Sequence, residues 1–121
     1  MANEISASTN LSVVNGSSKL SRQTSKTITQ NGVGTYQNTQ SVGTTYEAVA
    51  IGADLGTAGL AVFTNLDLTN YVEIGLEVSA AFYPLIKLKA GESAQVRLAT
   101  SSIFAKANTA AVKMEVIVLT D

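Results

Sequence analysis

Residues 59–99, GLAVFTNLDLTNYVEIGLEVSAAFYPLIKLKAGESAQVRLA, decide the fold class of this chain. They contain four short apolar runs separated by residues that favour turns, such as Pro84 and Ala90-Gly91-Glu92. Runs this short, rich in Val, Ile, Tyr and Phe, are typical of β-strands joined by turns. None has the length or period of an ordinary helix. The predicted strands are Leu60–Phe63, Tyr71–Ile74, Leu85–Leu88 and Ala94–Leu98.

The N-terminal part of the chain is polar and also has the pattern of strands. Residues 3–14 alternate strictly, with Ile5, Leu11 and Val13 among the residues of one parity and mainly Ser and Asn in the other. This alternation is the mark of a strand with one buried face. Asn15-Gly16 then favours a tight turn. Residues 19–30 predict a long polar strand, either at a sheet edge or leaving the body of the domain.

The remaining segments complete an all-β pattern. Residues 35–41 are polar and are interpreted as loop or strand, whereas 42–52 and 111–120 alternate as strands. Residues 100–111 are interpreted as a loop with one hydrophobic anchor, or as a short helical turn near 101–107. Strands at spacings of about 8–12 residues predict an antiparallel β-sandwich, jelly-roll-like, with about eight strands and at most one short helical turn. We expect one sandwich domain over 1–121, with 1–40 a polar extended part that contacts the rest of the domain or a neighbouring subunit.

Composition excludes several classes of function. The chain has 121 residues, a net charge of −1 and only 14% charged residues, against a usual share of about a quarter. A nucleic-acid binder needs a net basic face, so none is expected, although Lys19, Arg22 and Lys26 make one segment locally basic. No apolar run approaches the roughly 20 residues of a membrane span. The N-terminus has no pattern of a secretory signal, so we expect synthesis in a cytoplasm.

The sequence also lacks the commonest catalytic and metal-binding side chains, because it contains no Cys and no His. This removes thiol nucleophiles, Ser-His triads and most metal sites. Oxygen ligands do gather in Asn65–Asn70, but Asx-turn formation explains Asn and Asp there equally well. The carboxylates show no spacing typical of paired-carboxylate hydrolysis. We therefore predict no enzyme, no cofactor and no metal site.

Phe82-Tyr83-Pro84 is the most informative aromatic cluster. Adjacent strand residues point to opposite sides, so one of Phe82 and Tyr83 is expected in the core and the other at the surface. The exposed ring would then either pack within a hairpin or act as an interface anchor.

The central stretch resembles a known class of protein. NLDLTNYVEIGLE with FYPLIKLKAGESAQVRLA, and the opening MANEISASTNLSVVNGSSK, are similar to segments of small structural proteins encoded by tailed bacteriophages. The resemblance covers about two thirds of the chain and carries no catalytic motif. It implies a small all-β virion component that decorates or cements the capsid, found in the particle after assembly in the host cytoplasm.

From this resemblance and the absent catalytic residues we expect a capsid decoration or cement protein, which binds the major capsid protein or other virion proteins as a homotrimer. The alternative is a tail, neck or fibre module that binds host-surface carbohydrate. A small enzyme that relies on Asp, Glu, Lys or Tyr is a third and weaker reading. The predicted interface residues are Ile5, Leu11, Leu20, Arg22, Lys26, Ile28, Phe82 and Tyr83.

Overall fold

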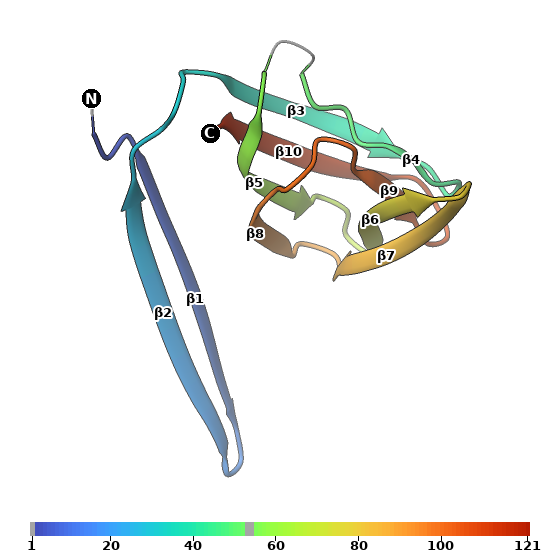
Figure 1. The fold of residues 1–121 in the computed structure, drawn as a ribbon. Coiled ribbons are helices and arrows are strands. Elements are labelled where there is room, and N and C mark those ends of the chain that lie inside the picture. Colours follow the sequence, from blue (N-terminus) through green and yellow to red (C-terminus); the bar gives the residue numbers. More distant parts are fainter. Residues whose placement is uncertain (1, 53–54) are drawn as a thin grey trace. The chain divides into compact units, whose positions relative to one another are not determined.

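The structure, a computed structural model, describes residues 2–52 and 55–121. Within these residues the chain forms ten β-strands and no helix (Figure 1). It divides into two compact units, Met1–Gly32 and Val33–Asp121. The polar part expected over 1–40 therefore contains the whole first unit and most of the first strand of the second, β3 (Thr35–Val42).

The first unit is a single long hairpin. Strands β1 (Ile5–Asn15) and β2 (Ser18–Ile28) pair antiparallel along their whole length, from Ile5–Ile28 at the base to Asn15–Ser18 at the tip. Gly16 and Ser17 form the two-residue turn, and Gly16 has a φ of 62°. Glycine with positive φ at the first central position is the arrangement of a type II′ turn, whose twist suits a hairpin. The turn predicted at Asn15-Gly16 is thus present.

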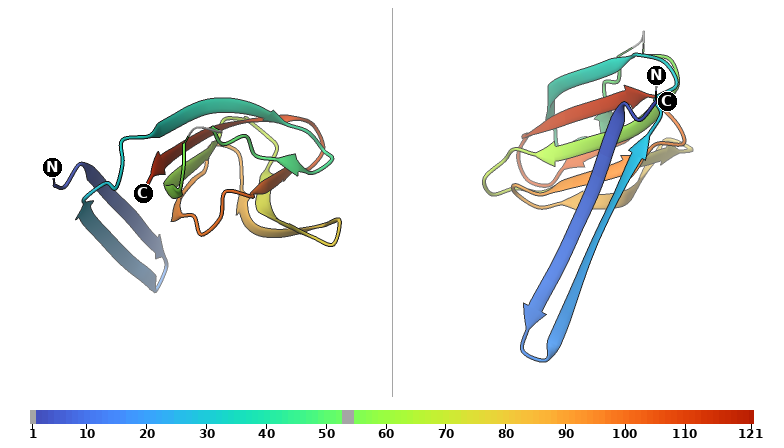
Figure 2. Two further views of the ribbon diagram at one scale, coloured as in Figure 1. Left: turned by 45° about the horizontal axis from the view of Figure 1, so that its top comes forward. Right: turned by 90° about the vertical axis from the view of Figure 1, so that its left-hand side faces the viewer.

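The second unit is a sandwich of two four-stranded antiparallel sheets (Figure 2). One sheet has the order β3-β10-β5-β8 and the other β4-β9-β6-β7. Besides β3, its strands are β4 (Glu47–Ala48), β5 (Ala58–Asn65), β6 (Val72–Val78), β7 (Ala81–Leu88), β8 (Ser93–Arg97), β9 (Phe104–Ala107) and β10 (Val112–Thr120).

Strand pairing within the sandwich is nested along the chain. The first strand, β3, pairs with the last, β10; β4 pairs with β9, β5 with β8, and β6 with β7. An antiparallel ribbon of eight strands rolled up in this order is a jelly roll. The prediction of an antiparallel, jelly-roll-like β-sandwich is confirmed.

The core lies between the two sheets and follows the period-two pattern of the sequence. In β10, Met114, Val116 and Val118 are fully buried and alternate with less buried residues. Phe63 of β5 is also fully buried and pairs with Val116, so the two central strands of the sheet supply the middle of the core. Apolar burial of this kind is the main favourable term in folding.

Several predicted elements differ from the observed ones. Of the strand expected over 42–52, only Val42, which ends β3, and Glu47–Ala48, which form β4, are in strands, because the chain passes after Val42 from one sheet to the other. The helical turn near 101–107 is absent, and Phe104–Ala107 instead forms β9, with Ala105 and Ala107 buried against the core. Pro84 was expected in a turn but lies within β7.

The β6–β7 hairpin contains two features that the sequence does not signal. Its turn is Ser79-Ala80, and both residues have positive φ, 52° and 61°. Two positive φ values define a type I′ turn, which normally uses Asn and Gly. A register shift also follows Ile74, because Gly75 pairs with Pro84 and leaves Leu85 as the extra residue of a bulge.

Candidate assembly surfaces

One face of the β1–β2 hairpin carries most of the interface residues predicted from the sequence. Cross-strand partners share a face of a two-stranded ribbon, and the register pairs Ile5 with Ile28 and Leu11 with Arg22 on the same face. The complete face, called here the hairpin apolar face, consists of Ile5, Ala7, Thr9, Leu11, Val13, Asn15, Ser18, Leu20, Arg22, Thr24, Lys26 and Ile28. All six predicted interface residues of the N-terminal part therefore lie together on one surface.

Near the tip this surface is strongly exposed. The exposed fractions are 66% for Leu11, 41% for Val13 and 58% for Leu20. At the middle of the face the Thr9 and Thr24 hydroxyls form a hydrogen bond of 2.7 Å across the strands. The opposite face carries Ser, Thr, Asn and Gln with Lys19 and Val14. A two-stranded hairpin is marginally stable alone in water, so an exposed aliphatic cluster on such a hairpin favours a partner.

A second apolar surface lies on the outside of the β3-β10-β5-β8 sheet. Ile117 and Leu119 alternate with buried Val116 and Val118, so their side chains point away from the core. Leu60 and Val62 do the same on β5, and Val62 pairs directly with Ile117. These four half-buried residues, called here the outer apolar stripe, adjoin Glu115 on the same face of β10. The Glu115 carboxylate accepts a long 3.4 Å hydrogen bond from Gln37 Nε2.

Phe82 and Tyr83 point to opposite sides of β7, but neither joins the buried core. Phe82 stacks on Tyr46 with ring centroids 5.6 Å apart, and Phe104 meets Tyr46 edge-on at 5.9 Å. Phe104 alternates with buried Ala105, which places this aromatic cluster on the outer face of its sheet. Tyr83 is 54% exposed. The expectation that one of the two rings is core is wrong, because Phe82 lies in the aromatic cluster on the outer face and Tyr83 lies close to the β6–β7 turn, away from the buried end of β7 at Leu88.

The Tyr46 hydroxyl is also engaged, since it donates a 2.8 Å hydrogen bond to the Glu77 carboxylate. This hydrogen bond raises the pKa of Tyr46 above its ordinary value, and desolvation and the charge of Glu77 add to the effect. The two stacked rings cover one face of each other, which leaves less ring surface for a sugar to stack on.

The edge strands on the two open sides of the sandwich differ in how they are protected from pairing with a further strand. On one side the Gln40 side chain of β3 bridges to the end of β4 and the residues after it, donating to the Ala48 carbonyl at 2.9 Å and accepting from the Ala50 N–H at 2.8 Å. On the other side the edge strand β7 carries Pro84 and the Leu85 bulge. Proline and bulges both disfavour pairing with a further strand, so β7 is poorly suited to strand addition.

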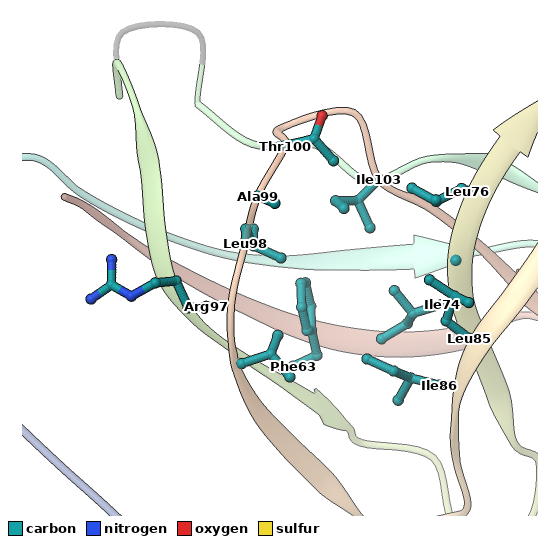
Figure 3. A pocket seen from close by; sticks show the side chains of 12 residues that line it. Phe63, Ile74, Leu76, Leu85, Ile86, Arg97, Leu98, Ala99, Thr100 and Ile103 are labelled. Carbon is teal, nitrogen blue, oxygen red and sulfur yellow. The ribbon is translucent and has the colours of Figure 1, made fainter. Parts of the chain in front are cut away.

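An apolar pocket of about 270 Å³ lies on the β7–β8 side, between the two sheets (Figure 3). Phe63, Ile74 and Ile86 face into it from the sheets, and Leu98 and Ile103 close it from the segment after β8. The Arg97 side chain points away from it and forms a 2.8 Å ion pair with Asp121. The lining offers few polar groups to orient a ligand.

The loop of Asn65–Asn70 is organised by its own side chains. The Asp67 carboxylate accepts hydrogen bonds from the N–H groups of Asn70 at 2.7 Å and Thr69 at 3.1 Å. These bonds, that of Asn70 first, hold the pKa of Asp67 below its ordinary value. The fully buried Asn65 amide donates to the Asn70 and Leu88 carbonyls, both at 2.9 Å. The oxygen-rich sequence thus serves an Asx turn, which was the alternative to a metal site.

Within residues 2–52 and 55–121 no group of three or more carboxylates is placed to hold a metal ion. Asp54 lies outside the described residues. The described part of the chain also contains no helix long and apolar enough to cross a membrane.

Comparison with known proteins identifies no relative: no family model, no curated protein and no solved structure matches this chain.

Proposed function

We propose that this protein is a non-enzymatic structural component of a bacteriophage virion, and that it decorates or cements the capsid by bridging major capsid subunits. The observation that carries the proposal is the pairing of a jelly-roll sandwich with a hairpin that exposes Leu11, Val13 and Leu20. Jelly rolls recur in viral capsid domains, which supports the proposal by analogy of fold alone.

The surface chemistry is compatible with this role. A cement protein needs a stable scaffold and an adhesive surface, and it needs no catalytic group. The apolar face of the hairpin supplies such a surface, and the resemblance of the central stretch to phage structural proteins points to the same kind of particle. Many weak contacts of this type share the load of packaged DNA.

The test is a comparison of particles made with and without the gene for this chain. We expect the protein to be found in purified virions by mass spectrometry, and particles that lack it to lose DNA at a lower temperature or on chelation of divalent cations. Absence of the protein from purified particles contradicts the proposal, and unchanged particle stability contradicts cementing.

A second candidate is a tail, neck or fibre module that binds carbohydrate, because lectin domains also use jelly rolls. The outer aromatic cluster of Tyr46, Phe82 and Phe104 favours it, but the stacking of Tyr46 on Phe82 reduces the ring area available to a sugar. Binding to a glycan array that is lost in Phe82→Ala would favour this candidate, and imaging of labelled particles separates tail from capsid positions.

A further inference from the structure

We propose that the hairpin apolar face of one copy packs on the outer apolar stripe of a second copy, with Arg22 of the hairpin beside Glu115 of the stripe. The inference names the surfaces through which the chain binds its own copies, and it rests on the proposed function only for the expectation that copies associate. It is a contact between two different surfaces of the same protein.

Both surfaces are sheet faces with aliphatic side chains directed outward. The hairpin contributes Leu11, Val13 and Leu20, and the stripe contributes Leu60, Val62, Ile117 and Leu119. Two sheets pack face to face when each presents such residues, at a separation of about 10 Å. The partner that we assign to the stripe is the hairpin of a second copy, and the mixing experiment below distinguishes this contact from docking within one chain.

Charge favours a contact between a hairpin and a sheet over a contact between two hairpins. Arg22 and Lys26 lie on the hairpin apolar face, and the sequence contains no acidic residue from 5 to 46. Two hairpins packed through this face would oppose cations with cations, which is unfavourable in a partly desolvated contact. Residues 1–32 carry three basic side chains and one acidic, a formal charge of +2, which leaves −3 for residues 33–121 because the whole chain carries −1.

Arg22 and Glu115 supply the opposite charges for this contact. Among the described residues, Arg22, Lys26 and Glu115 form no ion pair. On the hairpin, Arg22 lies two residues from Leu20, which pairs with Val13. On the sheet, Glu115 lies two residues from Ile117, which pairs with Val62. Each surface thus places a charge about 7 Å along the strand from an aliphatic pair, so one alignment matches the apolar pairs and sets Arg22 beside Glu115. Lys113 is exposed on the same face of β10, two residues beyond Glu115, and Arg97, which pairs with Leu60, is already engaged by Asp121.

Two different surfaces in contact form a heterologous interface, which closes into a ring when the rotation between copies permits. The expected trimer would be such a ring, with each copy giving its hairpin to one neighbour and receiving a hairpin from the other.

The experiment uses the full chain and two charge reversals, Arg22→Glu and Glu115→Arg, studied by sedimentation velocity over a range of concentrations. Each reversal creates a like-charge contact, so we expect the dissociation constant for self-association to rise at least about tenfold. Lys19→Glu, which makes the same change of net charge as Arg22→Glu but on the opposite face of the hairpin, is the matched control for that variant and should leave association unchanged.

Mixing the two reversed proteins gives the decisive result. Where the two variants are neighbours, the reversed hairpin meets the reversed sheet or the unchanged hairpin meets the unchanged sheet. A ring of three retains one contact between copies of the same variant, so we expect association to recover in part. A hairpin docked on the sheet of its own chain gains nothing from mixing. Failure of the mixture to recover, equal loss in Lys19→Glu, or a wild-type monomer at high concentration overturns the inference.

This outcome is separable from that of the proposed function. Self-association is measured on the isolated protein, whereas the virion role is measured on particles. A self-associating protein that is absent from purified particles contradicts the virion role and leaves the interface standing. A protein present in particles whose isolated form never associates through Arg22 and Glu115 contradicts the interface alone.

Discussion

Arg22 lies directly opposite Leu11 on the β1–β2 hairpin, so a charged and an aliphatic side chain share one exposed face near its tip. The next pair on the same face, two residues closer to the tip, is the aliphatic pair Val13 and Leu20. The same combination occurs on the outside of the sandwich, where Glu115 precedes the pair of Ile117 and Val62. The surfaces proposed for assembly are therefore defined by strand register, and substitutions elsewhere should change stability without changing assembly.

Gly75 is required by the close approach of β6 and β7. A Cβ atom built there would overlap the Tyr83 carbonyl oxygen and lie 2.8 Å from Pro84 Cα. Backbone atoms cannot move aside cheaply, so we expect Gly75→Ala to lower the free energy of unfolding by about 2–4 kcal/mol, measured by urea denaturation. Gly43→Ala is the control, because its nearest contact would be Glu47 Oε1 at 3.9 Å. An equal effect of the two substitutions contradicts this role of Gly75.

The Ser79-Ala80 turn holds two non-glycine residues in the left-handed region. Asn and Gly adopt this conformation at lower cost. We expect the double substitution Ser79→Asn/Ala80→Gly to raise the free energy of unfolding by about 1 kcal/mol, visible as a higher Tm. Ala81→Gly, at the adjacent position without positive φ, should instead destabilise the protein. A lower Tm for the double variant would show that the turn is not of type I′.

Asn65 links three segments of the sandwich from a fully buried position. Its amide donates to two carbonyls, and its side-chain oxygen accepts a 2.8 Å hydrogen bond from the Asp67 N–H. Asn65→Ala removes a donor from the buried Leu88 carbonyl and from the part-buried Asn70 carbonyl, so we expect it to cost about 2–4 kcal/mol in chemical denaturation. Asn10→Ala, on the exposed polar face of the hairpin, is the control. A cost below that of the control would contradict the role of Asn65.

We expect acid to lower the stability of the folded protein by protonating the Asp67 carboxylate. The N–H groups of Asn70 and Thr69 favour its charged form, and the pKa of the folded state lies below the ordinary value of 3.8. The carboxylate therefore stabilises the folded protein above about pH 4, and this contribution disappears as the pH falls through the lower pKa of the folded state. We expect the Tm difference between wild type and Asp67→Asn to shrink below pH 4. A constant difference from pH 7 to pH 2.5 would argue against this carboxylate.

The period-two pattern was enough to predict the architecture, because burial of one side-chain parity is a local property of the sequence. Residues 111–120 show it most clearly, and they form the central strand β10. The same reasoning grouped Ile5, Leu11 and Leu20 as candidate interface residues, which the register places on one face. Their function as an interface stays a prediction.

Other features of the fold could not be predicted from local sequence, because they depend on contacts between segments that are distant along the chain. Phe104–Ala107 pairs with both β4 and β6, and that pairing, rather than local propensity, makes it a strand. The turn at Ser79-Ala80 carries none of the Asn, Asp or Gly residues usual in a type I′ turn, and the bulge at Leu85 follows from the register of two strands. The sequence signals the outer apolar stripe only near Ile117, where residues of both parities are apolar. That pattern is equally typical of a strand covered on both sides.

The central claim, that the hairpin is an assembly element, is tested most directly by light scattering after size-exclusion chromatography. We compare the wild type with Leu11→Ser/Leu20→Ser and with the control Val14→Ser, which removes an exposed aliphatic side chain from the opposite face. The account predicts an oligomer, a trimer if the ring closes as proposed, for the wild type and for the control, and a folded monomer for the double variant. A wild-type monomer, or an oligomer unaffected by the double substitution, would contradict it.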